Sequence, residues 1–213
     1  MILKVNEIFY SIQGESRWIG YPCVFVRLAG CNLRCAWCDT TYAYDSGVDM
    51  TVREIVDRVR AYQGCMVELT GGEPLMQAHS ADLLRALLEL GYRVLLETNG
   101  TMSLRTVPGG VVRIMDVKCP SSGEQMKTLA ENFDLLTAED DVKFVVRDRA
   151  DFDFALSVIG GRALAGRCGI IFSPVWGRTP LDQLASWVLQ SGIEARMQVQ
   201  LHKVIWGAGA RGV

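Results

Sequence analysis

Residues 65–72 read CMVELTGG, a short and nearly continuous apolar run that ends at two glycines. Several further runs share this apolar, β-branched character: 23–30, 93–100, 111–118, 142–147, 168–174 and 195–203. Runs that are apolar throughout, instead of alternating with polar residues, are typical of parallel strands buried on both faces. The sequence therefore predicts an α/β protein with a mainly parallel sheet.

Amphipathic helices are predicted between several of these strands. Each has a capping residue before its apolar stripe or a glycine after it. The expected boundary residues are Thr51 with Glu54 in capping-box spacing, Ser80 with Gly91, and Thr179 with Gly192. Alternating strands and helices predict right-handed crossovers in a single domain, residues 1–213.

The chain length decides between the two common parallel architectures. At 213 residues the chain is shorter than a full eightfold barrel of about 250 residues. We expect an incomplete TIM-type barrel of about six or seven strands, with a doubly wound sheet as the alternative. In either fold the chemistry is expected at the C-terminal ends of the strands.

Composition excludes several classes of function. A net charge of −2 gives no basic excess for binding nucleic acid, and no apolar run is long enough to span a bilayer. The N-terminal residues lack the pattern of a secretory signal. Seven cysteines are an odd number, in a chain larger than disulfide-stapled scaffolds, which favours a reducing cytoplasm.

The stretch CNLRCAWCDTTY, residues 31–42, places three cysteines within eight residues. A structural zinc site normally has four protein ligands, and neither of the two histidines is near this loop. A distant fourth ligand such as Cys65 leaves zinc open. Simple core cysteines fit poorly, because Asn32 and Arg34 between them are polar. Iron–sulfur clusters usually take four thiolates, so three thiolates would leave one iron free for another ligand.

The cysteine loop followed by TGGEP at 70–74 resembles the radical S-adenosylmethionine (SAM) superfamily. That resemblance implies a [4Fe–4S] cluster on Cys31, Cys35 and Cys38, with the open iron bound by the amino and carboxylate groups of SAM. It also implies that Gly71, Gly72 and Glu73 line the methionine moiety. Glycines suit such a place because they let the backbone approach a ligand closely.

Residues 7–42 resemble, nearly end to end, the 7-carboxy-7-deazaguanine synthase family. Further matching segments extend over almost the whole chain: 96–101, 116–124, 172–177 and 200–206. The resemblance implies conversion of 6-carboxy-5,6,7,8-tetrahydropterin to 7-carboxy-7-deazaguanine and ammonia, in the biosynthesis of queuosine-type nucleosides. It also implies SAM used as a catalytic cofactor, a flavodoxin- or ferredoxin-type electron donor, and a homodimer.

The match implies one group of residues at the pterin: Ile12, Gln13, Gly14, Glu15, Arg27, Thr70 and His202. The Gln13 amide and Glu15 suit the donor and acceptor edge of a pterin. Arg27 offers a planar fork for a carboxylate; the alternative, a surface ion pair, would place it badly within an apolar run. On sequence alone, a turn around Gly14 explains its neighbours equally well.

A second group is implied at the cofactors: Trp37, Cys38, Asp39, Asp116, Val117, Lys118 and Ser173 for SAM, and Thr40 for Mg²⁺. A lone hydroxyl is a poor magnesium site unless substrate and water complete the octahedron, so an ordinary loop threonine is the alternative. The remaining cysteines are interpreted as core thiols: Cys23, Cys65, Cys119 and Cys168.

His202 follows an apolar run, so we expect it at a strand end that faces the barrel mouth. A core histidine is the usual alternative. The resemblance instead implies a catalytic place beside the pterin, where a neutral imidazole could hydrogen-bond substrate or assist proton transfer. The tail, residues 207–213, is expected to act as a lid.

Two rival functions remain open at this stage. A glycyl-radical-enzyme activase would also be a small radical SAM protein, but it would need a groove for a protein partner, and the stretch SIQGE, residues 11–15, would have no evident use. An electron-transfer iron–sulfur protein should supply four cluster ligands, and it would not explain TGGEP. Cleavage of SAM distinguishes the electron carrier from either enzyme.

Overall fold

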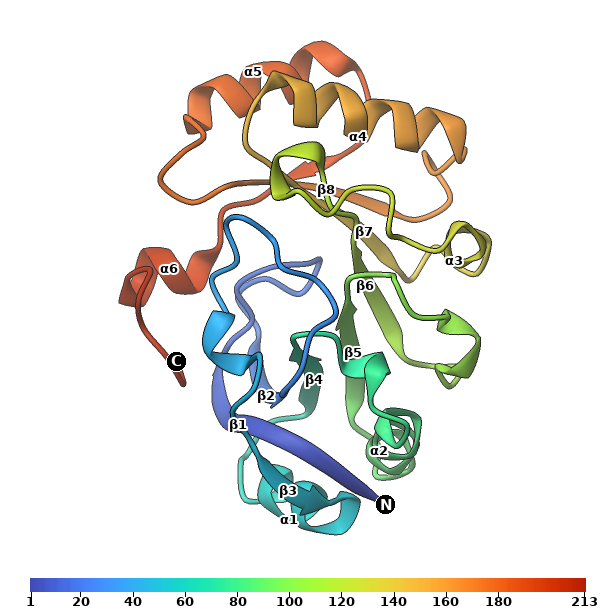
Figure 1. Ribbon diagram of the computed structural model, residues 1–213, viewed down its shortest axis with the longest axis vertical. Helices are drawn as coiled ribbons and strands as arrows, with labels where there is room; N and C mark the ends of the chain where they lie inside the picture. Colours follow the sequence, from blue (N-terminus) through green and yellow to red (C-terminus); the bar gives the residue numbers. More distant parts are fainter.

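The computed structural model describes residues 1–213, which form one open, nine-stranded sheet (Figure 1). The strands are β1 (Ile2–Ile12), β2 (Pro22–Leu28), β3 (Val48–Thr51), β4 (Met66–Gly71), β5 (Arg93–Thr98), β6 (Val112–Asp116), β7 (Asp141–Val146), β8 (Gly169–Pro174) and β9 (Arg196–Met197). Their spatial order is β3-β1-β2-β4-β5-β6-β7-β8-β9. From β2 to β9 every pair is parallel, whereas β1 pairs antiparallel with β2 and β3.

The predicted α/β fold with an incomplete, mainly parallel barrel is confirmed. The sheet has two more strands than the upper expectation, because β1 and β3 extend it on the antiparallel side. The expected strand at 195–203 is mostly wrong. Only Arg196 and Met197 pair with β8, after which the Gln198 amide donates to the Phe172 carbonyl and the chain turns into a helix.

The helices are α1 (Val52–Arg60), α2 (Ser80–Glu89), α3 (Ala130–Asp134), α4 (Arg149–Gly161), α5 (Leu181–Ser191) and α6 (Leu201–Trp206). The predicted capping box at the start of α1 is confirmed, with Thr51 and Glu54 each bonding the other's backbone amide. The other two predicted N-caps are wrong. The hydroxyl of Ser80 donates to the Pro74 carbonyl, and that of Thr179 donates to Val146, so neither caps its helix.

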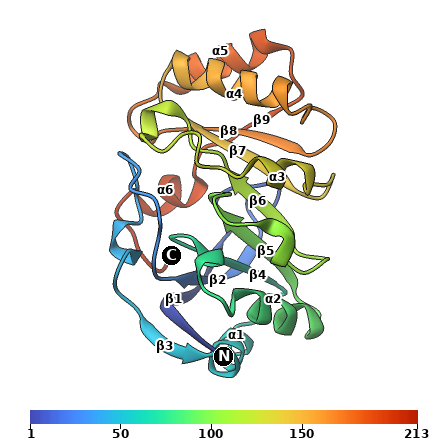
Figure 2. The ribbon, with the colours of Figure 1, turned by 45° about the vertical axis from the view of Figure 1, so that its right-hand side comes forward.

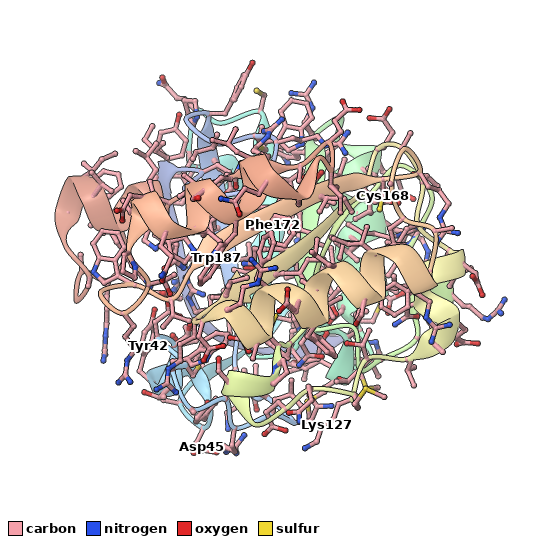
Figure 3. The ribbon with its side chains drawn as sticks, turned by 90° about the horizontal axis from the view of Figure 1, so that it is seen from above. Tyr42, Asp45, Lys127, Cys168, Phe172 and Trp187 are labelled. Atoms are coloured by element: carbon pink, nitrogen blue, oxygen red, sulfur yellow. The ribbon has the colours of Figure 1, made fainter.

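The helices divide between the outside of the sheet and the site side. α1 and α2 lie at one end of the molecule, and α4 and α5 lie across the other (Figures 1 and 2). Seen from above, α4 and α5 run side by side, with Phe172 and Trp187 between them (Figure 3). In contrast, α6 and the C-terminus lie beside the cysteine-containing segment 30–47. None of the helices has the length and apolar character needed to cross a bilayer.

Side chains alternate between the two faces of the sheet, and the faces differ in polarity. On β4, Val67 and Leu69 join the large apolar core beneath the helices, while Glu68 points to the opposite, concave side. Charged residues occupy the same inward place on the next strands: Glu97, Asp116 and Lys143. Both faces are buried, as predicted, but the concave face carries charged side chains as well as apolar ones.

The loop between β1 and β2, residues 13–21, closes the concave side from below. It leaves β1 at the N-terminal ends of the parallel strands, because Ile12 pairs with Pro22 at the start of β2. Arg17 binds Asp141 at the start of β7, with its Nε and Nη2 3.1 and 2.8 Å from Oδ1. Trp18 packs on an inward apolar cluster of Cys23, Phe25, Met66, Leu95 and Ile114. We call residues 13–21 the floor loop.

Candidate active site

A cavity of about 560 Å³ lies on the concave side, between the floor loop, the strand ends and α6. Every residue predicted to bind substrate, cofactor or metal lines it except Glu73, Val117 and Ser173. We expect the chemistry at the C-terminal ends of the strands. These ends form only the upper part of the cavity. The stretch 12–15 enters from the opposite end, through the floor loop.

The three cysteines of the loop line the upper part of the cavity and are half-buried. Backbone bonds anchor the loop at several points, including Gly30 to the Ala43 carbonyl at 2.9 Å and Ala36 to the Ser122 carbonyl at 3.0 Å. Burial raises the pKa of the Cys31 thiol, and raises the pKa of Cys35 to about 11. Thiols of this kind become good ligands only when a metal displaces their protons. The loop therefore supplies three accessible sulfurs and no nearby fourth.

Cys65 lies too far away to complete a zinc site. It precedes the first residue of β4, whereas the cysteine loop follows the last residue of the neighbouring parallel strand β2. Six residues of strand separate those ends by about 20 Å. No three His, Cys, Asp or Glu side chains converge as ligands of a single metal ion. Cys65 is also exposed, so its interpretation as a core thiol is wrong, while the other three extra cysteines are buried.

Gly71 and Gly72 let the end of β4 pack against the start of the cysteine loop. A Cβ atom at Gly71 would lie 2.2 Å from the Leu28 carbonyl oxygen, and one at Gly72 would lie 2.1 Å from that of Gly30. The two glycines therefore allow β4 to approach the protein's own backbone closely. A larger residue at either position would push the cysteine loop away from the cavity.

Glu73 does not line the cavity, but its carboxylate bonds two residues that do. Its carboxylate accepts hydrogen bonds from the amides of Asn99 at 2.7 Å and Leu75 at 3.0 Å, and from the Thr98 hydroxyl. Burial raises its pKa despite these bonds. The geometry gives Glu73 the role of holding the turn after β4, which differs from the expected contact with the methionine moiety.

The middle of the cavity is a charged layer centred on Lys143. Its Nζ lies 2.6 Å from Glu15 Oε2, 2.5 Å from Glu97 Oε1 and 3.5 Å from Asp116 Oδ2. Burial opposes ionisation of Glu97, but the Lys143 charge wins and holds the Glu97 pKa at about 2. Thr70 donates to the other Glu97 oxygen at 2.9 Å. Lys143 thus pairs with three inward carboxylates and keeps that of Glu97 ionised.

Beside this layer, Gln13 makes two bonds within the protein. Its Nε2 donates to Glu68, and its Oε1 accepts from the Glu15 amide at 3.0 Å. The Gln13 amide therefore fixes the floor loop, which leaves less of it free for the pterin edge than the sequence suggested. The buried Glu68 has its pKa raised to about 8 by desolvation and by the nearby Glu97 charge.

Arg27 lies in the cavity wall and is not a surface ion pair. Its Nε donates to Glu7 Oε1 at 2.7 Å, and the Tyr42 hydroxyl donates to the same oxygen at 3.1 Å. The two Nη nitrogens make no hydrogen bond within the chain, so they remain available to a ligand. Arg211 of the tail stacks over the Tyr42 ring at 4.0 Å, which joins the chain end to this wall.

Around the cysteine loop, Asp39 links several expected contacts. It accepts from the Thr40 hydroxyl at 2.9 Å and is paired with Lys203 of α6. The Asp39 side chain is partly open to solvent, and although desolvation opposes its ionisation, the Lys203 charge lowers its pKa far below the usual range. Trp37 donates from Nε1 to the Ser121 hydroxyl at 3.1 Å. The loop is therefore tied both to α6 and to the segment after β6.

Two buried polar atoms near the cofactor-side residues have no partner within the chain. They are Asp116 Oδ1 and Ser173 Oγ. Lys118 occupies the other Asp116 oxygen at 2.9 Å. Orphaned buried polar atoms are costly, so they mark places where a ligand can bind. Val117, by contrast, points into the core beneath the helices, so only its backbone could meet a ligand.

His202 lies on α6 and not at a strand end, but it does face the cavity. The α6 backbone reaches the floor loop directly, since the Leu201 amide donates to the Gly14 carbonyl at 3.0 Å. Burial lowers the His202 pKa, so the imidazole is neutral near pH 7. His79, the other histidine, is near the surface and bonds Asp82.

Sequence reasoning missed several cavity residues: Glu7, Tyr42, Glu68, Glu97, Lys143, Gln200 and Lys203. A signal for part of this set was present. Glu68, Glu97 and Lys143 are charged residues inside otherwise apolar strands, and such residues are almost never buried without a partner or a function.

Comparison with known proteins agrees with this geometry. Residues 26–159 match the family model "Radical SAM superfamily". A 7-carboxy-7-deazaguanine synthase of Chlorobaculum tepidum is 48% identical over 99% of this chain and 97% of its own length. One from Koribacter versatilis is 42% identical over 99% and 100%. The crystal structure of QueE from Escherichia coli matches with a TM-score of 0.78, at 21% identity and 95% coverage of both chains, which supports the fold.

Proposed function

Because this chain belongs to the 7-carboxy-7-deazaguanine synthase family of the radical SAM superfamily, we propose that its cavity converts 6-carboxy-5,6,7,8-tetrahydropterin to 7-carboxy-7-deazaguanine and ammonia. The observation that carries the proposal is that one cavity has a cysteine-lined end and a charged, substrate-binding end. Three thiols lie at its top, and an arginine with fixed carboxylates lies at its side and floor.

The chain's residues fit the cofactors of this family. Cys31, Cys35 and Cys38 would hold a [4Fe–4S] cluster, and the missing fourth thiol leaves room for SAM. The unpartnered Asp116 oxygen belongs to a residue that lines the cavity, where a polar group of SAM could use it. The radical chemistry is supplied by these two cofactors when they are bound, with SAM regenerated in each turnover.

We assign the substrate-binding end of the cavity from its charged residues and from the hydrogen-bond donors of Arg27 that have no partner within the chain. The Arg27 Nη nitrogens would bind the pterin carboxylate, with Glu7 and Tyr42 holding the guanidinium in place. Glu15 and Glu97, both paired with Lys143, would accept hydrogen bonds from the amino and ring N–H groups of the pterin. Thr40, beside Asp39, would provide one oxygen to a Mg²⁺ ion that the substrate carboxylate and water complete.

Closure of the cavity supports a small-molecule substrate. The floor loop blocks it below, and residues 208–213 line its mouth. A radical reaction benefits from such walls because they exclude competing hydrogen donors. The alternative of a glycyl-radical-enzyme activase is not favoured, since the full-length relatives are 7-carboxy-7-deazaguanine synthases. A cytoplasmic homodimer reduced by a flavodoxin or ferredoxin completes the proposal.

Anaerobic turnover tests the function directly. Reconstituted protein is incubated with the pterin, SAM, Mg²⁺ and a reductant, and the product is identified by mass and absorbance. We expect a product lighter than the substrate by one ammonia, with SAM not consumed in proportion. Cys35→Ala protein serves as the control. SAM cleavage at a rate that does not depend on the pterin, with no deazaguanine formed, would contradict the proposal.

A further inference from the structure

Glu68 differs from every other carboxylate that lines the cavity. The others each lie within 4 Å of a lysine or arginine nitrogen: Glu7, Glu15, Asp39, Glu97 and Asp116. Glu68 makes no ion pair, and its bonding partner is the neutral amide of Gln13. Glu68 is only 4% exposed to solvent. A buried carboxyl group without a cation favours its neutral, proton-bearing form.

The groups around Glu68 reinforce that preference. Glu97 and Glu15 face it with negative charges, and the Cys23 thiol lies nearby on β2. Lys143 also acts on it electrostatically, but its ammonium is hydrogen-bonded to Glu15 and Glu97. Desolvation is the largest effect, and together these surroundings raise the Glu68 pKa to about 8. At neutral pH the cavity wall therefore carries one carboxylic acid among carboxylates.

We propose that Glu68 is the general acid that protonates the nitrogen lost as ammonia, an inference that rests on the proposed function. In this step the carbon–nitrogen bond breaks with both electrons going to nitrogen, which takes the proton from the Glu68 carboxyl group. The ring then loses one proton as it becomes aromatic, and that proton returns to the Glu68 carboxylate. The step needs no oxidant or reductant, and Glu68 ends as it began.

The other ionisable groups at this level are poorly suited to donate. Lys143 is surrounded by carboxylates that raise its pKa well above the usual value, so it holds its protons firmly. Glu97 is already ionised at neutral pH. His202 has its pKa lowered by burial and carries no extra proton to give. General acids work best when their pKa lies near the working pH, and Glu68 meets that condition.

The decisive variant is Glu68→Gln. A glutamine oxygen can still accept from the Gln13 amide, so the floor loop keeps its support while the transferable proton is lost. We expect kcat to fall by about 10²–10⁴-fold with the pterin KM nearly unchanged. In single turnovers ammonia should appear later than the loss of substrate absorbance.

In the wild type kcat should fall as pH rises through about 8, and the Glu68→Gln variant should lose this pH dependence. The exposed Glu139→Gln is the control.

Infrared spectroscopy tests the proton without relying on turnover. The wild-type protein should show a protonated-carboxyl band at pH 7 that disappears toward pH 9 and is missing in Glu68→Gln. Absence of that band in the wild type would overturn the proposal, as would a Glu68→Gln enzyme with normal kcat. A raised KM with normal kcat would instead show that Glu68 only positions the floor loop. If the wild type makes no deazaguanine, the proposed function fails, while the infrared result still reports the Glu68 proton.

Discussion

A Cβ atom at position 14 would lie 2.2 Å from Nδ1 of His202, although the two residues are far apart in the sequence. Gly14 is in the floor loop and His202 is on α6, so this contact is where the chain end closes onto the substrate side of the cavity. The absence of a side chain at position 14 is therefore what permits α6 to sit there.

Gly14→Ala should move His202 and α6 away from the floor. We expect the pterin KM to rise about tenfold, equivalent to about 1.4 kcal/mol, with cluster content unchanged. Gly160→Ala on α4, where an added Cβ meets nothing within 4 Å, is the matched control. Steady-state kinetics and iron analysis measure both effects.

His202→Ala alone should weaken pterin turnover and leave SAM binding intact. In the double variant with Gly14→Ala, the steric conflict is gone, so the two effects should not add. Additive losses in the pterin KM would show that residue 14 and the imidazole act independently.

Each of Cys31→Ala, Cys35→Ala and Cys38→Ala should lose both cluster and activity, because the loop offers three sulfurs and no replacement nearby. Cys65→Ala should keep the cluster, since that thiol lies at the opposite end of the sheet. Iron and sulfide determination after anaerobic reconstitution is the measurement. A fully loaded Cys35→Ala protein would refute the assignment.

Thr40→Val should retain cluster absorbance but lose most of the stimulation of turnover by Mg²⁺, because magnesium binds through oxygen ligands. The neighbouring exposed Thr41→Val is the control and should respond to Mg²⁺ as the wild type does. Turnover is measured over a range of Mg²⁺ concentrations. Equal stimulation in both variants would make Thr40 an ordinary loop residue.

Lys143→Met should lower the free energy of unfolding at pH 7 by about 3–5 kcal/mol, because it leaves buried carboxylates without their cation. In the wild type the Glu97 pKa lies near 2, below the ordinary 4.5, so its contribution to stability is lost as pH falls from about 4.5 toward 2.

The pH dependence of Lys143→Met should have the opposite sign. Without the lysine, desolvation raises the pKa of Glu97, so its protonation makes the variant more stable as pH falls from 7 to 5. Urea unfolding at both pH values measures this. Arg53→Met, which removes an exposed ion pair with Asp57 on α1, should change stability by less than about 1 kcal/mol. A Lys143→Met protein as stable as that control would contradict the network.

Deleting residues 207–213 should raise the pterin concentration needed for half-maximal rate and leave SAM binding intact. The deletion removes the Arg211–Tyr42 contact and opens the cavity mouth. Arg211→Gln, which keeps the tail but weakens its stacking on Tyr42, should show a smaller effect in the same direction. Wild-type pterin kinetics in the truncated protein would place the tail outside the active site.

Local patterns in the sequence were sufficient for the parallel strands β2 and β4 to β8 and for one helix start, but not for β1, β3 or β9. The apolar runs of β4 and β5 predict buried parallel strands, and Thr51 with Glu54 predicts the start of α1, because each depends on residues a few positions apart. The three cysteines are likewise close in sequence, so their shared place in one loop needed no tertiary information.

Only the tertiary structure decided which polar residues meet inside the sheet. Glu15, Glu97 and Lys143 come from the floor loop, β5 and β7, and they converge because alternate side chains of a curved sheet point to one interior. The floor loop enters that interior from the end opposite to the cysteines, which the chain order does not reveal. Whether a charged residue in an apolar strand is paired, as Glu97 is, or holds a proton, as Glu68 does, depends on the distance to a cation, and that distance exists only in the folded protein.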